Sequence, residues 1–93
     1  MSGSVKTFQA RMALQDHQAL ARRLTAVRQE LQAATAVLVK AYGKSDVKCR
    51  YLERTLAALD LVRGHCSHAL VHEHSERPVR ELSAVYYPPE PNR

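Results

Sequence analysis

The sequence has few of the residues that interrupt helices. Between Val5 and Tyr42 it contains neither glycine nor proline, and all four prolines follow Ser75. Apolar residues never continue for the roughly twenty positions that a membrane-spanning helix needs, and the N-terminus lacks the basic and apolar segments of a secretion signal. We therefore expect a soluble, intracellular protein, cytoplasmic or nuclear, that consists of long helices.

Cysteine is scarce as well, which argues against a disulfide-stapled fold. Cys49 and Cys66 are the two cysteines, and both fall in one expected helix, where a rise of about 1.5 Å per residue separates them by about 25 Å. A disulfide needs Cα atoms within about 7 Å of each other. We expect two free thiols, with Cys66 acting as a small core residue.

Motifs that carry enzyme chemistry are absent. The sequence has no glycine-rich phosphate loop, no G-x-S-x-G elbow and no H-E-x-x-H zinc motif. Cys66 beside His65 and His68 is the one conceivable nucleophile arrangement, but neighbouring residues of a helix point in different directions. We expect no enzymatic activity and no cofactor.

Two segments carry apolar residues at heptad spacing, which is the pattern of helices that pack along a seam. The first segment extends to Tyr42, and its seam residues are Leu20, Leu24, Val27, Leu31, Ala34, Leu38 and Ala41. The second extends from about Asp46 to His72 or Glu73, with Arg63 as the one interruption of its seam. Its seam residues are Leu52, Leu56, Leu59, Cys66 and Leu70. The two segments predict an antiparallel hairpin of long, coiled-coil-like helices.

Local signals mark the ends of these helices. Ser4 or Thr7 is a candidate N-cap, so the first helix should begin near Val5 and continue for roughly 36 residues. Gly43 can end it in a left-handed conformation, and Ser45 or Asp46 can cap the second helix. A turn this short makes the helices antiparallel, and the numbers of paired residues should sum to roughly 88.

The composition changes after the hairpin, which we assign to residues 1–74. Residues 75–93 hold all four prolines. They predict a short amphipathic helix around Val79, Leu82, Val85 and Tyr86, or an extended tail rich in proline and tyrosine. In such a tail, Tyr86 and Tyr87 next to proline have the character of a docking peptide.

The first helix also has a second apolar stripe, which one partner helix cannot cover. A dimer of hairpins that forms a four-helix bundle would bury it, and so would a helical protein partner. The residues that we expect to bind such a partner are Val5, Phe8, Met12, Ala19, Ala26, Ala33, Val37, Tyr86 and Tyr87. The sequence therefore favours a non-enzymatic interaction or scaffolding module that forms a homodimer or assembles with a helical partner.

A basic helical hairpin that binds RNA or DNA is the alternative function. The net charge is +5, and a basic excess suits contacts with phosphates. The residues that would make these contacts are Arg22, Arg23, Arg28, Lys40, Lys44, Lys48 and Arg50. Because the sequence offers neither an aromatic platform for base stacking nor a helix-turn-helix spacing, we favour the protein partner.

Four of the five histidines gather near the end of the second helix. His65, His68 and His72 have i, i+3, i+7 spacing and are the one set of candidate metal ligands that we identify. They point away from the seam, so we interpret them as an exposed polar stripe and expect no metal. His17 occupies a seam position close to His74, where we expect a hydrogen-bonded core residue that makes packing pH-sensitive.

Overall fold

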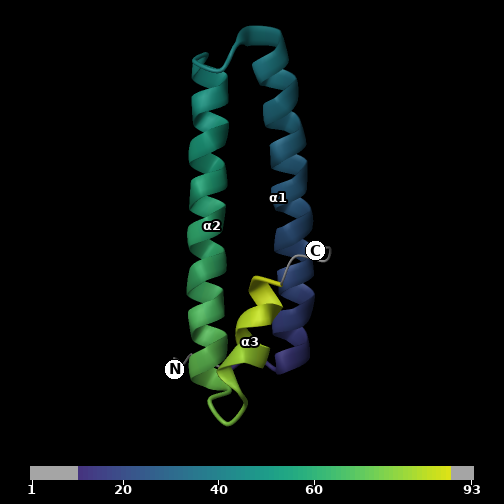
Figure 1. Ribbon diagram of the computed structural model, residues 1–93, viewed down its shortest axis with the longest axis vertical. Helices are drawn as coiled ribbons and strands as arrows, with labels where there is room; N and C mark the ends of the chain where they lie inside the picture. Colours follow the sequence, from purple (N-terminus) through teal and green to yellow (C-terminus); the bar gives the residue numbers. More distant parts are fainter. Residues whose placement is uncertain (1–10, 89–93) are drawn as a thin grey trace, which may run out of the picture.

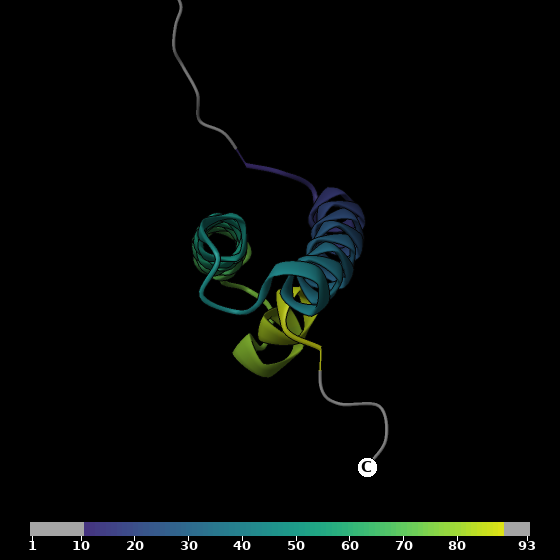
Figure 2. The same cartoon turned by 90° about the horizontal axis from the view of Figure 1, so that it is seen from above.

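The computed structural model describes residues 11–88, which form three α-helices and no strand. α1 spans Leu14–Tyr42, α2 spans Val47–Glu73 and α3 spans Val79–Tyr86. α1 and α2 run antiparallel, and α3 packs against both of them at the end away from their connecting turn (Figure 1). Seen from above, α3 covers one face of the two-helix layer (Figure 2). The predicted helical hairpin with a short C-terminal helix is confirmed for these residues.

The turn between α1 and α2 follows the predicted signals. Gly43 ends α1 with φ +93°, a conformation that favours glycine, and its N–H donates to the Val39 carbonyl at 2.9 Å. Asp46 caps α2, since its carboxylate accepts a hydrogen bond from the Lys48 N–H at 2.9 Å. Cys49 is buried beside this turn, where its thiol donates to the Gly43 carbonyl. The turn is therefore closed by backbone and capping bonds together.

The start of α1 differs from the prediction. α1 begins at Leu14, and Ala13 at its N-cap makes no side-chain capping bond. The predicted start near Val5 and the candidate caps Ser4 and Thr7 lie outside the described residues. Residues 11–13, which the prediction also placed in the helix, are not helical.

Tertiary hydrogen bonds explain why the chain is not helical just before α1. The Met12 N–H donates to the Glu73 carboxylate at 3.1 Å, and the Met12 carbonyl accepts a hydrogen bond from His74 at 2.8 Å. Both Met12 backbone groups are therefore bonded to the end of α2. Since these are the groups that would extend α1, the bonds to α2 hold residues 11–13 in a non-helical path.

An ion pair between the two long helices confirms the predicted register. Arg28 Nε lies 2.8 Å from Asp60 Oδ1, and Arg28 Nη2 lies 3.1 Å from Asp60 Oδ2, so the contact is bidentate. The two residue numbers sum to 88, the value expected for a hairpin centred on the Gly43 turn. The Arg28 hydrogen bond holds the pKa of Asp60 below its usual range, so this carboxylate is charged at neutral pH.

The seam of α1 is only partly where the heptad pattern placed it. Leu24, Leu31 and Leu38 are half-buried as predicted, but Val27 is 46% exposed, and Ala34 and Ala41 are exposed. The positions that alternate with these leucines toward α2 are Ala21, Arg28 and Thr35.

Two polar side chains on α1 account for this difference. Arg28 is neutralised by Asp60, and the Thr35 hydroxyl donates to the Leu31 carbonyl of its own helix at 2.8 Å. Because both polar groups have partners, α1 can turn them toward α2 without leaving an unsatisfied group. This orientation of α1 leaves one flank of its seam, with Val27, Ala34 and Ala41, exposed.

The seam of α2 matches the prediction. Its residues Leu52, Leu56, Leu59 and Cys66 are half-buried and Leu70 is fully buried. Cys49 and Cys66 are both free thiols, as expected from their separation along one helix. None of the helices within residues 11–88 is long and apolar enough to cross a membrane.

The core lies at the end of the hairpin where α3 docks. Ala21 of α1, Leu70 of α2 and Leu82 and Tyr86 of α3 form one buried cluster. Between residues 22 and 48, by contrast, no residue is fully buried. The molecule therefore consists of a packed three-helix base and a two-helix arm that ends at the Gly43 turn.

Candidate functional site

A chain of hydrogen bonds crosses the base and joins all three helices. His17 of α1 is 2% exposed; its Nδ1 lies 2.8 Å from the Tyr86 hydroxyl and its Nε2 lies 2.9 Å from Glu73 Oε1. Because the carboxylate can only accept, His17 Nε2 carries a proton, and in the neutral ring Nδ1 accepts from Tyr86. The pKa of Glu73 is lowered, chiefly by this hydrogen bond from His17.

Tyr86 is the α3 member of this chain. It is 1% exposed, and burial raises the pKa of its hydroxyl to about 12. The hydroxyl therefore keeps its proton at neutral pH and can donate it to His17. A hydroxyl, an imidazole and a carboxylate in series resemble a nucleophile with its base, but a hydroxyl buried to this degree has no access to a substrate. The series serves to hold α3 against α1 and α2.

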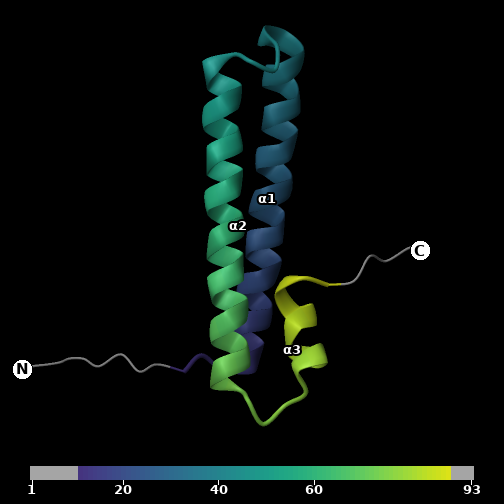
Figure 3. The same ribbon diagram turned by 60° about the vertical axis from the view of Figure 1, so that its left-hand side comes forward.

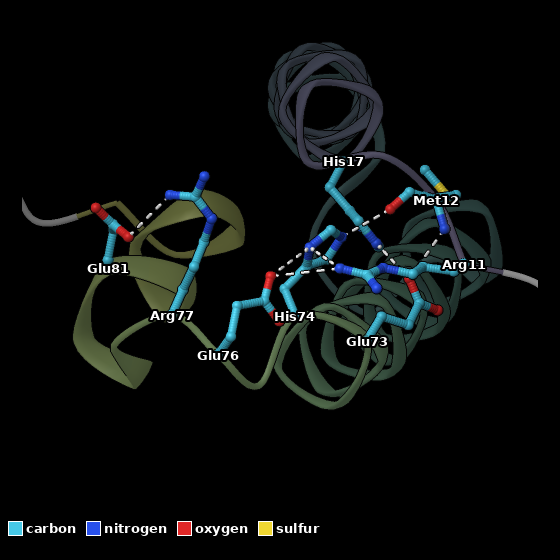
Figure 4. A network of polar contacts seen from close by, with 8 residues as sticks. All are labelled: Arg11, Met12, His17, Glu73, His74, Glu76, Arg77 and Glu81. Carbon is cyan, nitrogen blue, oxygen red and sulfur yellow. Dashed lines mark hydrogen bonds and ion pairs between the residues drawn. The ribbon is translucent and has the colours of Figure 1, made fainter.

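His74 lies beside this chain, just after α2 (Figure 4). Its Nε2 donates to the Met12 carbonyl at 2.8 Å, so its Nδ1 is the acceptor for Arg11 Nη2 at 3.1 Å. Glu76 joins the group, with Oε2 at 3.3 Å from Arg11 Nη2 and 3.6 Å from His74 Nδ1. The rings of His17 and His74 meet edge to face, with centroids 6.1 Å apart.

These contacts bring three metal-ligating side chains together. His17, Glu73 and His74 each offer one ligand atom, and the three atoms lie within 4.8 Å of one another. The predictions that His17 is a hydrogen-bonded core residue and lies close to His74 are confirmed. The stripe of His65, His68 and His72 is exposed, as predicted. The stripe is not the only candidate ligand set, because His17, Glu73 and His74 form a second one. The predicted register could have indicated this second set, since it places His17 opposite the end of α2.

The contacts of Arg63 explain why a charged residue interrupts the apolar seam of α2. Its side chain is 15% exposed, and Nη2 donates to the Tyr86 carbonyl at 2.8 Å while Nη1 lies 3.2 Å from Asp60 Oδ1. Its guanidinium carbon also lies 5.0 Å from the centre of the Tyr87 ring. The residue that interrupts the apolar seam is therefore the one that receives the C-terminal end of α3.

The prediction that Tyr86 belongs to an exposed docking peptide is wrong. Its hydroxyl is bonded to His17 and its carbonyl to Arg63, so the residue is part of the core. Tyr87, by contrast, is 48% exposed. The residues after Pro88 lie outside the described part of the chain. Sequence reasoning missed the role of Tyr86 because both of its partners are distant in the sequence.

The other predicted partner-binding residues lie on the outer side of α1. Ala19 is half-buried, whereas Ala26, Ala33 and Val37 are exposed, Val37 at 66%. Met12 is 37% exposed and precedes the helix. Val5 and Phe8 lie outside the described residues. A binding role for this stripe stays a prediction.

The predicted nucleic-acid residues are partly engaged in internal contacts. Arg28 pairs with Asp60, and Lys48 lies 3.3 Å from Asp46 and 3.9 Å from the centre of the Tyr42 ring. The other five are exposed and form no ion pair with a described residue: Arg22, Arg23, Lys40, Lys44 and Arg50.

Comparisons of the chain with protein-family models, with curated proteins and with solved structures gave no match.

Proposed function

We propose that this protein is a non-enzymatic helical interaction module that self-associates through the face of the α1–α2 hairpin opposite α3. The carrying observation is that α2 and α3 leave one flank of the α1 seam uncovered within residues 11–88, with Val27 46% exposed between the half-buried Leu24 and Leu31. Apolar residues at heptad spacing that α2 does not cover are typical of a helix with a second partner.

The uncovered flank continues onto α2. α3 covers the other side of the hairpin (Figure 3). On that side, Thr25 of α1 and Val85 of α3 line the same groove, and a Cβ added at Gly64 of α2 would lie 3.5 Å from the Tyr87 hydroxyl. At about 100° per residue, Val27 and Val62 lie on the opposite flanks of their helices from Thr25 and Gly64. We define the open face by its apolar residues, of which Leu20 and Leu59 are half-buried at its inner edge and the others are exposed: Leu20, Val27, Ala34, Ala41, Leu59 and Val62.

A second copy of the chain is the occupant that the charges favour. Arg23 and Glu30 are both exposed and border the open face on α1, almost equally far along the helix from Val27. If two copies pair antiparallel about a two-fold axis near Val27, Arg23 of each copy lies next to Glu30 of the other. The same pairing places apolar residues of both hairpins together, which produces a four-helix bundle.

Light scattering on the purified chain, with a matched pair of variants, tests this proposal. We expect a dimer of about 21 kDa, twice the 10.5 kDa of one chain. Val27→Glu places a charge on the open face and should give a monomer with unchanged helicity. Ala33→Glu introduces the same side chain at an exposed position about 120° away on the same helix, so it should leave the dimer intact.

Two results would contradict the proposal. One is a monomeric parent protein that unfolds cooperatively at a concentration-independent temperature. The other is a dimer that Ala33→Glu disrupts and Val27→Glu does not, which would place the contact on the second apolar stripe of α1.

The alternative, binding of RNA or DNA, is favoured by the exposed basic residues near the turn. Lys40, Lys44 and Arg50 form no ion pair with a described residue, and Lys48 lies close to them in the sequence. Changing Lys44 and Arg50 to Ala should then weaken binding to duplex RNA and reduce its dependence on salt, without changing the dimer. Salt-independent or undetectable binding by the unmodified chain would exclude this function.

A further inference from the structure

We propose that His17, Glu73 and His74 form a binding site for a divalent transition-metal ion, with Zn²⁺ as the best fit. The three ligand atoms lie within 4.8 Å of one another, and they come from the first turn of α1 and from the end of α2. Two imidazoles and one carboxylate are a ligand set that Zn²⁺ uses in proteins, with a further position for water or another oxygen.

A bound ion requires the ligand atoms, which now lie within 4.8 Å of one another, to move by up to about 1.5 Å. Zn²⁺ binds nitrogen and oxygen ligands at about 2.0–2.1 Å, so two ligand atoms of a tetrahedral site lie about 3.3 Å apart. His17 Nε2 and Glu73 Oε1 are already 2.9 Å apart. His74 Nε2 lies 2.8 Å from the Met12 carbonyl oxygen and would exchange that hydrogen bond for the metal. The Met12 oxygen is then an additional donor at the edge of the site.

When a metal binds at Nε2, the proton of each imidazole can move to Nδ1 of the same ring. Without a metal, Nε2 of each ring donates a hydrogen bond, to Glu73 from His17 and to Met12 from His74. Metal binding at Nε2 moves the proton to Nδ1 in each ring, with no net loss of protons from the pair. Nδ1–H of His17 then donates to the Tyr86 oxygen, which lies 2.8 Å away.

His74 has a carboxylate in the outer position that metal-bound imidazoles usually have. Glu76 Oε2 lies 3.6 Å from His74 Nδ1 and can accept its proton. Arg11, which now donates to Nδ1 at 3.1 Å, also lies 3.3 Å from Glu76 Oε2 and can remain paired with that carboxylate. Outer-shell partners of this kind orient the ligands and typically contribute 10- to 100-fold to metal affinity.

Burial distinguishes this site from the histidine stripe on α2. His17 is 2% exposed and His74 is 6% exposed, whereas the stripe residues His65, His68 and His72 are exposed. Within residues 11–88, the stripe histidines do not belong to any group of three His, Cys, Asp or Glu side chains whose ligand atoms lie close enough together to hold one ion. An ion held in the base would join the first turn of α1 to the end of α2, next to Tyr86 of α3.

Zn²⁺ titration of the full chain, produced without a histidine tag, tests the site. Calorimetry should show one ion per chain, and the melting temperature should rise with added Zn²⁺. Side-chain ¹⁵N spectra should show His17 and His74 changing from Nε2–H to Nδ1–H tautomers. A purely structural histidine pair would show no such change. His74→Gln should abolish this binding, and the triple variant His65→Gln, His68→Gln, His72→Gln should keep it.

A variant outside the core keeps the test decisive if His74→Gln fails to fold. Glu76 is 59% exposed, so Glu76→Gln should leave helicity unchanged while weakening Zn²⁺ binding about tenfold or more. The proposal is overturned if the unmodified chain does not bind Zn²⁺ or if the triple stripe variant loses the binding. It is equally overturned if the two ring tautomers stay as they are when Zn²⁺ is added.

Discussion

Replacement of Tyr86 by Phe measures how much one hydroxyl contributes to the docking of α3. The change removes the donor that lies 2.8 Å from His17 Nδ1 and keeps the ring in the core. His17 is 2% exposed, so water cannot replace the donor, and the buried acceptor is left unsatisfied. That penalty is about 1–3 kcal/mol, which in a chain of this size lowers the melting temperature by about 4–8 °C per kcal/mol.

Urea denaturation followed by circular dichroism provides the measurement, with Tyr87→Phe as the matched control. Tyr87 is 48% exposed, so loss of its hydroxyl should change the free energy of unfolding by less than about 0.5 kcal/mol. In a His17→Leu background the Tyr86 hydroxyl has lost its acceptor, and Tyr86→Phe should then be close to neutral. Equal effects of Tyr86→Phe in both backgrounds would refute the hydrogen bond.

Three further predictions concern packing, pH and the turn. Leu82→Ala should lower the free energy of unfolding by about 2–5 kcal/mol because Leu82 is 1% exposed, whereas Val79→Ala, at 63% exposed, should cost less than about 0.5 kcal/mol in thermal melts. Arg28 lowers the pKa of Asp60, so their contribution to stability is present above the unfolded-state pKa of about 4 and is lost as pH falls through the lowered value. The urea midpoint of Asp60→Asn should therefore fall less steeply on acidification than that of the parent protein. Gly43→Ala should cost at least about 1 kcal/mol through its backbone alone, since φ is +93° and no atom lies within 4 Å of an added Cβ; a melt equal to that of the parent would contradict this.

Features that depend on neighbours in the sequence could be predicted. Gly43 and Asp46 act at the turn through local backbone and capping bonds, and the first helical residue of α3 follows Pro78 directly. The register of Arg28 with Asp60 follows from the position of the turn alone. These features can be predicted without the tertiary structure, because each depends on residues close to it in the sequence or on its distance along the chain from the turn.

Features that depend on distant partners could not be predicted in full. The backbone of Met12 is held by the end of α2, so helix propensity does not decide where α1 begins. Thr35 and Arg28 take positions facing α2 because each has a polar partner, which a pattern of apolar residues does not record. The sequence allows Tyr86 to belong either to a short helix or to an extended tail, and its bond to the distant His17 is what places it in the core.

The division into an arm and a base has a consequence for the order of folding. Arg28 and Asp60 are 32 residues apart, whereas His17 and Tyr86 are 69 residues apart. Since loop-closure entropy rises with separation, we expect contacts nearer the Gly43 turn to form before those of the base and the closure of the base around Tyr86 to come late. Substitutions at His17 or Tyr86 should therefore accelerate unfolding and leave the refolding rate almost unchanged. If substitutions there have this effect, the bonds that complete the base control the lifetime of the folded chain more than the speed at which it forms.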